Sequence, residues 1–306
     1  MAADLHVWKG GKTDHETHWA DADNWVSGVL PADGDSVRIP KYAAYGIAGW
    51  DTIETDTVHL VDFIEEDGCT RQIGTDEAAA GTNVGRLKID ADNVVLGGTG
   101  QHFMEIVNHA GDLIVTESAP TTGNKPGKCL IITAGAAARR LVCTASAGQT
   151  VGLAALPGQT SVLDEIVVGG TGTLIVGSGV TQYSSGAPDL IIASGTVESR
   201  CPLEAVTTRG TYTHQSGTVT TLRIDAGTTT YNSSGTPTTI YQAGGSTLVM
   251  GPSAATPTTY RLSGSGARLD DPHGRITSKF NLDNCRLSDH TLNTAANKGW
   301  TPGAVS

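Results

Sequence analysis

One pattern returns along residues 163–290, an apolar run with a glycine or asparagine four or five positions after its first residue: Ile166-Val-Val-Gly-Gly170, Leu190-Ile-Ile-Ala-Ser-Gly195-Thr, Val206-Thr-Thr-Arg-Gly210-Thr, Leu222-Arg-Ile-Asp-Ala-Gly227-Thr, Ile240-Tyr-Gln-Ala-Gly-Gly245-Ser, Tyr260-Arg-Leu-Ser-Gly264-Ser and Phe280-Asn-Leu-Asp-Asn284. The first residues of successive copies are 24, 16, 16, 18, 20 and 20 positions apart. One rung of a β-solenoid takes roughly 16 to 25 residues, in short strands separated by corners. The spacing therefore predicts a β-solenoid (parallel β-helix).

The solenoid makes specific predictions within the repeats. Stacked rungs place the apolar residue of one turn over that of the next and bury a column that a single rung could not bury alone. We expect four first residues of the copies to point inward: Ile166, Leu190, Leu222 and Ile240. We expect three glycines to form corners: Gly195, Gly210 and Gly227. A β-sandwich or jelly roll is the alternative, because its strands also return at short intervals between glycine-rich turns.

The composition supports an all-β protein. The 306 residues include 39 glycines, with 38% hydrophobic and only 5% aromatic residues, and no Gly-X-Y period of collagen is present. Abundant Val, Ile and Thr favour pleated strands over helices, because β-branched side chains keep their preferred rotamers there.

Charge and cysteine usage restrict the partners. The net charge of -11 repels phosphate backbones and anionic membranes, so neither a nucleic-acid nor a membrane partner is predicted. The five cysteines are odd in number, widely spaced and never in a C-x-x-C pair: Cys69, Cys129, Cys143, Cys201 and Cys285. They predict buried thiols in a protein assembled in a reducing cytosol, without disulfides or a zinc site.

We expect four segments along the chain. Residues 1–62 form a tryptophan-rich cap or attachment region, 63–162 irregular early rungs and loops, 163–290 the regular solenoid, and 291–306 a tail. Residues 119–127, rich in Pro and Gly, predict an exposed loop. The first segment holds four of the five tryptophans, which are the candidate interface residues because Trp is enriched in binding hot spots: Trp8, Trp19, Trp25 and Trp50. An alternative role for them is to cap the end of the core.

Catalytic and metal-binding motifs are missing from the sequence. Glu65-Glu66-Asp67 and Asp270-Asp271 could supply carboxylates, but adjacent residues of a strand point to opposite faces, so we interpret both clusters as solvated turns. Asp90-Ala-Asp-Asn93 lacks the rest of a calcium loop, and Asp21-Ala-Asp-Asn24 is explained by Asx-turns before Trp25. We therefore predict no catalytic residue, no metal and no cofactor.

The only aromatic series within the repeats consists of tyrosines: Tyr212, Tyr231, Tyr241 and Tyr260. Two interpretations are open for this series, an inward or flanking stack in the solenoid, or an outward row on which sugar rings could stack.

The N-terminus carries a recognisable module: Val7-Trp8-Lys-Gly-Gly11, Trp19-Ala-Asp-Ala-Asp-Asn24-Trp25, Gly28-Val-Leu-Pro31 and Gly34-Asp35-Ser-Val-Arg-Ile39. It resembles the W-x-G-G…N-W…P-x-x-G-D opening of β-helical surface proteins, found on bacterial adhesins and on structural proteins of tailed phages. The resemblance covers residues 7–40 and implies the start of a β-solenoid.

Function follows from the resemblance and from the absence of an export signal, which adhesins of that type carry. We expect a non-enzymatic structural protein of a bacteriophage virion, an outer capsid decoration or cement protein assembled in the host cytoplasm. Its expected partners are the major capsid protein or other virion proteins, and a homo-oligomer, with a trimer suggested by the resemblance. The alternatives are a tailspike-like protein that binds or cleaves glycans, and a fragment of a bacterial surface adhesin.

Overall fold

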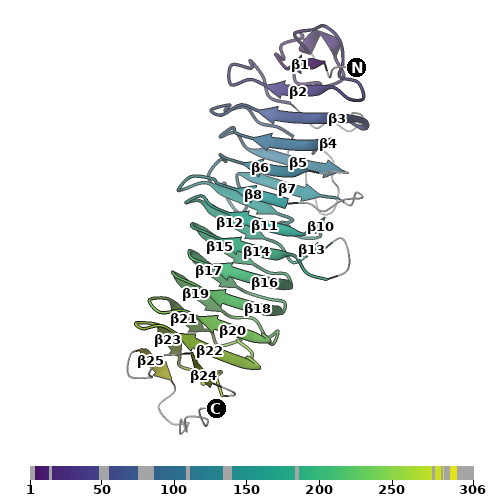
Figure 1. Ribbon diagram of the computed structural model, residues 1–306. Helices are drawn as coiled ribbons and strands as arrows, with labels where there is room; N and C mark the ends of the chain where they lie inside the picture. Colours follow the sequence, from purple (N-terminus) through teal and green to yellow (C-terminus); the bar gives the residue numbers. More distant parts are fainter. Residues whose placement is uncertain are drawn as a thin grey trace.

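The protein is a parallel β-solenoid, seen in a computed structural model as an elongated stack of rungs with the N-terminus at one end (Figure 1). The structure describes residues 4–13, 16–47, 55–74, 86–107, 111–133, 140–182, 186–277, 280–283, 285 and 290–294. Each rung places one strand on each of two faces, which we call face 1 and face 2. The solenoid prediction is confirmed, and the sandwich or jelly-roll alternative does not describe the chain.

Face 1 is a ladder of parallel pairs that starts at the N-terminal end. Its strands are β1 (Leu5–Val7), β2 (Ser36–Ile39), β3 (Thr55–Glu65), β4 (Leu87–Leu96), β6 (Asp112–Val115), β8 (Arg140–Cys143), β11 (Glu165–Val168), β14 (Asp189–Ile192), β16 (Leu203–Thr208), β18 (Val219–Ile224), β20 (Thr239–Gln242), β22 (Thr259–Ser263) and β24 (Phe280–Asp283).

Face 2 begins at the first residues of β4 and is also parallel. Its strands are β5 (His102–Val107), β7 (Lys128–Ile132), β9 (Thr150–Leu153), β12 (Thr173–Val176), β15 (Thr196–Ser199), β17 (Thr211–His214), β19 (Thr228–Tyr231), β21 (Thr247–Met250), β23 (Arg268–Asp271) and β25 (Thr291–Thr294). A separate two-stranded sheet pairs β10 (Ser161–Val162) with β13 (Val180–Thr181).

The repeat anchors lie in register on face 1. Each first residue of a copy pairs with the next, in the order Ile166, Leu190, Val206, Leu222, Ile240, Tyr260 and Phe280. The four anchors that we expected to point inward are fully buried. Buried and outward residues alternate along most strands, as the period-2 pattern requires, and β7 and β9 are buried at every position; the buried residues form one continuous apolar column.

Short corners join face 1 to face 2, and the predicted glycines lie in them. Gly195 and Gly227 have φ of +82° and +73°, which residues with a Cβ rarely adopt. A Cβ on Gly195 would lie 2.5 Å from the carbonyl oxygen of Gly170 in the corner of the preceding rung. The stacked corners therefore require glycine both for backbone conformation and for space.

The early segments belong to the same sheet. Within residues 1–62, β1 pairs with β2, and β2 pairs with β3. Leu87-Lys-Ile-Asp, which is chemically similar to Leu222-Arg-Ile-Asp, pairs with Met104-Glu-Ile-Val on face 2 instead of occupying the position of Leu222. Residues 119–127 form a mostly exposed loop closed by a bridge between Thr122 and Lys125, as expected.

Most of the cysteines, and three of the four tyrosines in the repeats, are interior residues. None of the five cysteines, all of which the structure describes, forms a disulfide; four are buried, and Cys285 is partly buried. Tyr212, Tyr231 and Tyr260 are fully buried, which supports the inward stack. Tyr241 points outward, and the guanidinium carbon of Arg261 lies 5.6 Å from its ring centroid.

Candidate functional site

The candidate attachment tryptophans lie in the interior of the N-terminal end. Trp25 packs edge-on against Trp8 and Trp19, with ring centroids 5.1 and 4.7 Å away. The indole N–H of Trp8 donates to the carbonyl of Tyr45 at 3.1 Å, and Trp19 stacks on Phe63 of β3. The three indoles are at most 6% exposed, so they cap the apolar column and offer almost no surface to a partner. Trp50 lies outside the described residues.

A polar turn holds Trp25 in this position. The carboxylate of Asp21 accepts the N–H of Asp23 at 3.0 Å and starts the 3₁₀ turn η1 (Ala22–Asn24). The buried amide of Asn24 donates to the carbonyl of His18 at 2.9 Å and accepts the N–H of Lys12 at 2.8 Å. The Asx-turn interpretation is therefore confirmed.

Several large hydrophobic side chains are exposed at this end, among polar residues such as Lys9 and Lys41. Eight large hydrophobic side chains are exposed in the described part of the chain, and six of them lie in its first 45 residues: Leu5, Val26, Val29, Leu30, Tyr42 and Tyr45. We call these six residues the apolar cap surface. The N–H of Val26 donates to Val7 of β1, and the Nδ1 atom of His6 lies 3.3 Å from the carbonyl of Val29, so the loop after Trp25 lies against β1.

The period-2 pattern explains why sequence analysis selected the tryptophans and missed the cap surface. Hot-spot enrichment points to Trp wherever it occurs, but β1 places His6 inward and Leu5 outward. The two strands of this end are only three and four residues long, too short for alternation to be recognised.

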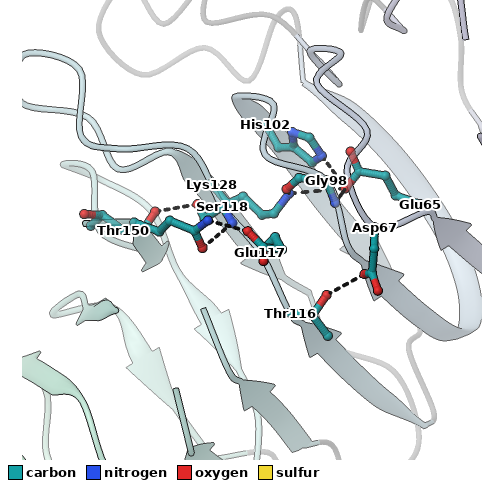
Figure 2. Close-up of polar contacts among 10 residues, drawn as sticks. Glu65, Asp67, Gly98, His102, Thr116, Glu117, Ser118, Lys128 and Thr150 are labelled. Carbon is teal, nitrogen blue, oxygen red and sulfur yellow. Dashed lines mark hydrogen bonds and ion pairs between the residues drawn. The ribbon is translucent and has the colours of Figure 1, made fainter. Parts of the chain in front are cut away.

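A buried charged cluster lies one step further along the rod, where we expected a solvated turn. Glu65, at the end of β3, is 1% exposed and contacts His102 and Lys128, the first residues of β5 and β7 (Figure 2). Its Oε2 atom lies 2.8 Å from Nε2 of His102 and 3.2 Å from Nζ of Lys128, and accepts the N–H of Gly98 at 2.8 Å. The solvated-turn interpretation is wrong for Glu65, because the alternation that buries Phe63 also turns Glu65 inward.

The cluster contains one ion pair at neutral pH. Burial raises the pKa of Glu65, but the charges and hydrogen bonds of His102, Lys128 and Gly98 outweigh it and lower that pKa to about 2. Burial and then the Lys128 ammonium lower the pKa of His102 below its ordinary 6.5, so the imidazole is neutral. Burial also lowers the pKa of Lys128, but the Glu65 carboxylate beside it raises that pKa, so Lys128 is the cation of the pair. The Lys128 ammonium also donates to the carbonyl of Gly98 at 2.8 Å.

Burial decides what this cluster can do chemically. The side chains of Glu65, His102 and Lys128 have no exposed area, so a substrate does not reach them in this conformation. The cluster joins β3, β5 and β7, three strands that are distant in sequence, and its role here is structural.

A second buried polar cluster resembles a nucleophile with its base but is equally closed. The hydroxyl of Ser199 lies 2.8 Å from Nδ1 of His214 and 2.9 Å from the hydroxyl of Tyr212, and all three residues are fully buried. Nε2 of His214 lies 3.0 Å from the carbonyl of Gly217, which makes Nε2 the donor and Nδ1 the acceptor. The cluster lies between β15 and β17 and fills the core.

The other candidate carboxylates also have structural roles. Asp271 is buried and accepts the N–H groups of Arg275 and Ile276 at 2.8 Å each, so the solvated-turn interpretation is wrong for it too, whereas Asp270 points outward. Asp90 and Asp92 flank the imidazole of His59, at 2.8 and 3.4 Å.

Among the residues that the structure describes, no group of three or more His, Cys, Asp or Glu side chains is placed to hold a metal ion, and no helix is long and apolar enough to cross a membrane. No family model, curated protein or solved structure matches this chain. The class of protein is therefore defined by its fold, a parallel β-solenoid with a closed interior and exposed hydrophobic side chains at its N-terminal end.

We expect the protein to lose stability as the pH falls, because His102, His214 and Glu65 are buried and take up protons less readily in the folded state. The folded-state pKa values of His102 and His214 are lowered from 6.5, chiefly by burial, and that of Glu65 from 4.5 to about 2. The unfolded chain therefore binds more protons below these ordinary values, and we expect the free energy of unfolding to fall below about pH 6.5 and again below pH 4.5. The lowered pKa of Glu65 corresponds to about 3 kcal/mol, which is lost progressively below pH 4.5 and fully lost only below pH 2.

Urea denaturation between pH 8 and pH 3.5, followed by circular dichroism, measures this dependence. The double variant Glu65→Gln/Lys128→Met is the matched control, because it removes the Glu65 contribution and leaves His214 in place. A free energy of unfolding that stays constant from pH 8 to pH 3.5 would contradict the assignment.

Proposed function

We propose that this chain is a non-enzymatic structural protein of a bacteriophage virion, an outer capsid decoration or cement protein that contacts the particle through its N-terminal end. The observation that carries the proposal is the apolar cap surface at one end of the rod. Monomeric proteins rarely leave large apolar groups clustered on the surface, and such clusters mark interaction sites. Hydrophobic side chains at one end suit end-on attachment, with the solenoid projecting away.

Two further features support a virion component. From β1 to β24, face 1 stacks strands over roughly 60 Å at ~4.8 Å per strand, a length that suits a projecting surface element. The thiols are free, and four of the five are buried, which is compatible with assembly in a reducing cytosol. The N-terminal module, residues 7–40, is the part of the sequence that resembles β-helical phage proteins, and it carries Val26, Val29 and Leu30 of the cap surface.

The particle partner in this proposal is the major capsid protein or another virion protein, and the chain itself forms a homo-oligomer. Because the indoles are buried, the contact surface in our proposal shifts from Trp8, Trp19 and Trp25 to the exposed side chains around them. The indoles position that surface by holding β1 and the loop after Trp25 together.

We expect Val26→Asp/Val29→Asp to weaken binding to phage particles at least tenfold, because both side chains are exposed and a carboxylate there must be desolvated on attachment. Co-sedimentation of the purified chain with particles of the phage that encodes it measures the binding. Thr211→Asp/Thr228→Asp, on exposed positions far along the rod, is the matched control and should bind like the wild type.

Two results would overturn the proposal. One is the absence of the chain from purified particles together with no binding when it is added back. The other is release of oligosaccharides from capsular or lipopolysaccharide glycans that is lost in Asp270→Asn, which would establish a glycan-cleaving protein instead.

A further inference from the structure

Face 1 carries a straight column of aliphatic side chains on its outer surface. The residues pair in register from β3 to β14 and alternate with the buried positions of each strand: Ile64, Val95, Ile114, Val142, Val167 and Ile191. We call them the aliphatic column. The two end members are 36% and 39% exposed, and the four between them are partly exposed. The column runs parallel to the solenoid axis for about 24 Å, five intervals of ~4.8 Å.

The fold itself does not require these aliphatic residues. In the next rungs of the same face, the same register position is occupied by Thr207, Arg223, Tyr241 and Arg261. The inward position just before it stays apolar from Phe63 on β3 to Tyr260 on β22, so at this point of the rung the two halves of face 1 differ on the outside. An outward position that accepts Arg in one half and holds only Val or Ile in the other indicates a surface that is covered in the first half.

The spacing of the column identifies what covers it. A partner must offer apolar side chains at the same ~4.8 Å interval to stay in contact with every rung of the column. An α-helix repeats every 5.4 Å and drifts by about 3 Å over five intervals. A second copy of this chain has the identical column, with β-branched side chains at the identical interval, so two facing columns can pack against each other rung by rung along their whole length.

The charges beside the column determine the relative direction of the two copies. Two residues before each column member lies an acidic flank: Asp62, Asn93, Asp112, Arg140, Glu165 and Asp189. Two residues after each member lies a flank that is mostly small and neutral: Glu66, Gly97, Thr116, Thr144, Gly169 and Ala193. Arg140 pairs within its own chain, with Asp112 at 2.6 Å and Glu165 at 3.8 Å.

Antiparallel copies would place the acidic flank of one chain opposite the acidic flank of the other, which is repulsive. Parallel copies, related by an axis along the solenoid, place each acidic flank opposite the small neutral flank. We propose that copies of this chain associate side by side and in parallel through the aliphatic column of face 1. The inference rests on the proposed function only for its expectation of a homo-oligomer.

The first test compares oligomeric mass. Sedimentation velocity at micromolar concentration should show the wild type as an oligomer and Val142→Arg/Val167→Arg as a monomer of 31.5 kDa. The matched control Ile175→Arg/Val249→Arg, at outward positions of face 2, should keep the wild-type mass. The same register position already holds Arg in later rungs, at Arg223 and Arg261, so the fold tolerates Arg there. Circular dichroism verifies that the variants fold. If the Arg variant does not fold, Val142→Thr/Val167→Thr replaces it, with an expected loss of oligomer of at least tenfold.

A monomeric wild type, or a folded column variant that keeps its oligomeric mass, would overturn the proposal. These outcomes are separate from the particle-binding test, because the cap variants change attachment and leave the mass unchanged.

A second test examines direction. Val95→Cys and Ile191→Cys, near opposite ends of the column, are introduced one at a time and oxidised. Parallel copies bring each introduced thiol to the same height as its equivalent, so both variants should form a disulfide-linked dimer. Antiparallel copies with overlapping columns would hold each introduced thiol three intervals (about 14 Å) from its equivalent in Val95→Cys and five intervals (about 24 Å) in Ile191→Cys, and only a central position such as Val142→Cys would link. Linking at the centre alone would refute the parallel arrangement.

Discussion

Lys128→Met is expected to cost about 3–5 kcal/mol of unfolding free energy, because it leaves the Glu65 carboxylate buried without its cation. After the substitution, Glu65 retains only the Gly98 N–H and the neutral imidazole of His102, all inside the core. Urea denaturation at pH 7.5 measures the loss. The exposed Lys9→Met is the matched control and should change stability by less than about 0.5 kcal/mol.

The double variant Glu65→Gln/Lys128→Met separates the pair from its parts. Removing both charges replaces a buried ion pair with neutral groups of similar shape, so most of the loss should be recovered. In Lys128→Met, His102 is still present, so the pH dependence of the stability loss is a second measurement. Without the ammonium that disfavours it, imidazolium at His102 can neutralise Glu65, so the loss should be smaller at pH 5.5 than at pH 8. Equal losses in the single and double variants would show that Lys128 acts through packing alone.

The repeats predicted the solenoid and its register, because each copy can bury its apolar side chain only by stacking on the neighbouring copies. Ile166, Leu190, Val206 and Leu222 pair in succession because each lies four or five residues before a corner, and the stacked backbones at these corners require glycine. Where the corner residues vary, as around Leu87, chemical similarity of a segment did not reveal which face it occupies. Local sequence specifies a strand, while its face depends on the number of residues since the previous corner.

The polar interior was predicted less well, because charge was taken as a sign of exposure. Along β3, the alternation that buries Phe63 buries Glu65, whereas along β7 every residue from Lys128 to Ile132 is buried. Glu65 could have been assigned to the interior from its spacing, but nothing local shows that it would meet Lys128, 63 positions away. The outward aliphatic column was missed because a face was predicted only for the first residue of an apolar run, and residues such as Val167, one position later, were given none.

Leu222→Asp should abolish cooperative folding of the central rungs, with a loss of at least about 5 kcal/mol. Leu222 is fully buried between Val206 and Ile240, so the substitution removes a core side chain and leaves an unpaired carboxylate in the apolar column. Thr221→Asp, one position earlier and on the outward face, is the matched control and should fold normally.

The site of the damage tests the architecture as well as the residue. In a solenoid each rung contacts only its neighbours, so disruption should begin at β16, β18 and β20 while distant rungs such as β6 and β8 keep their own contacts. Hydrogen exchange followed by mass spectrometry should therefore show fast exchange first in residues 203–242, with protection retained in residues 112–143. Uniform loss of protection along the whole chain would mean that the rod unfolds as a single unit, and a wild-type exchange pattern would mean that Leu222 is not a core residue.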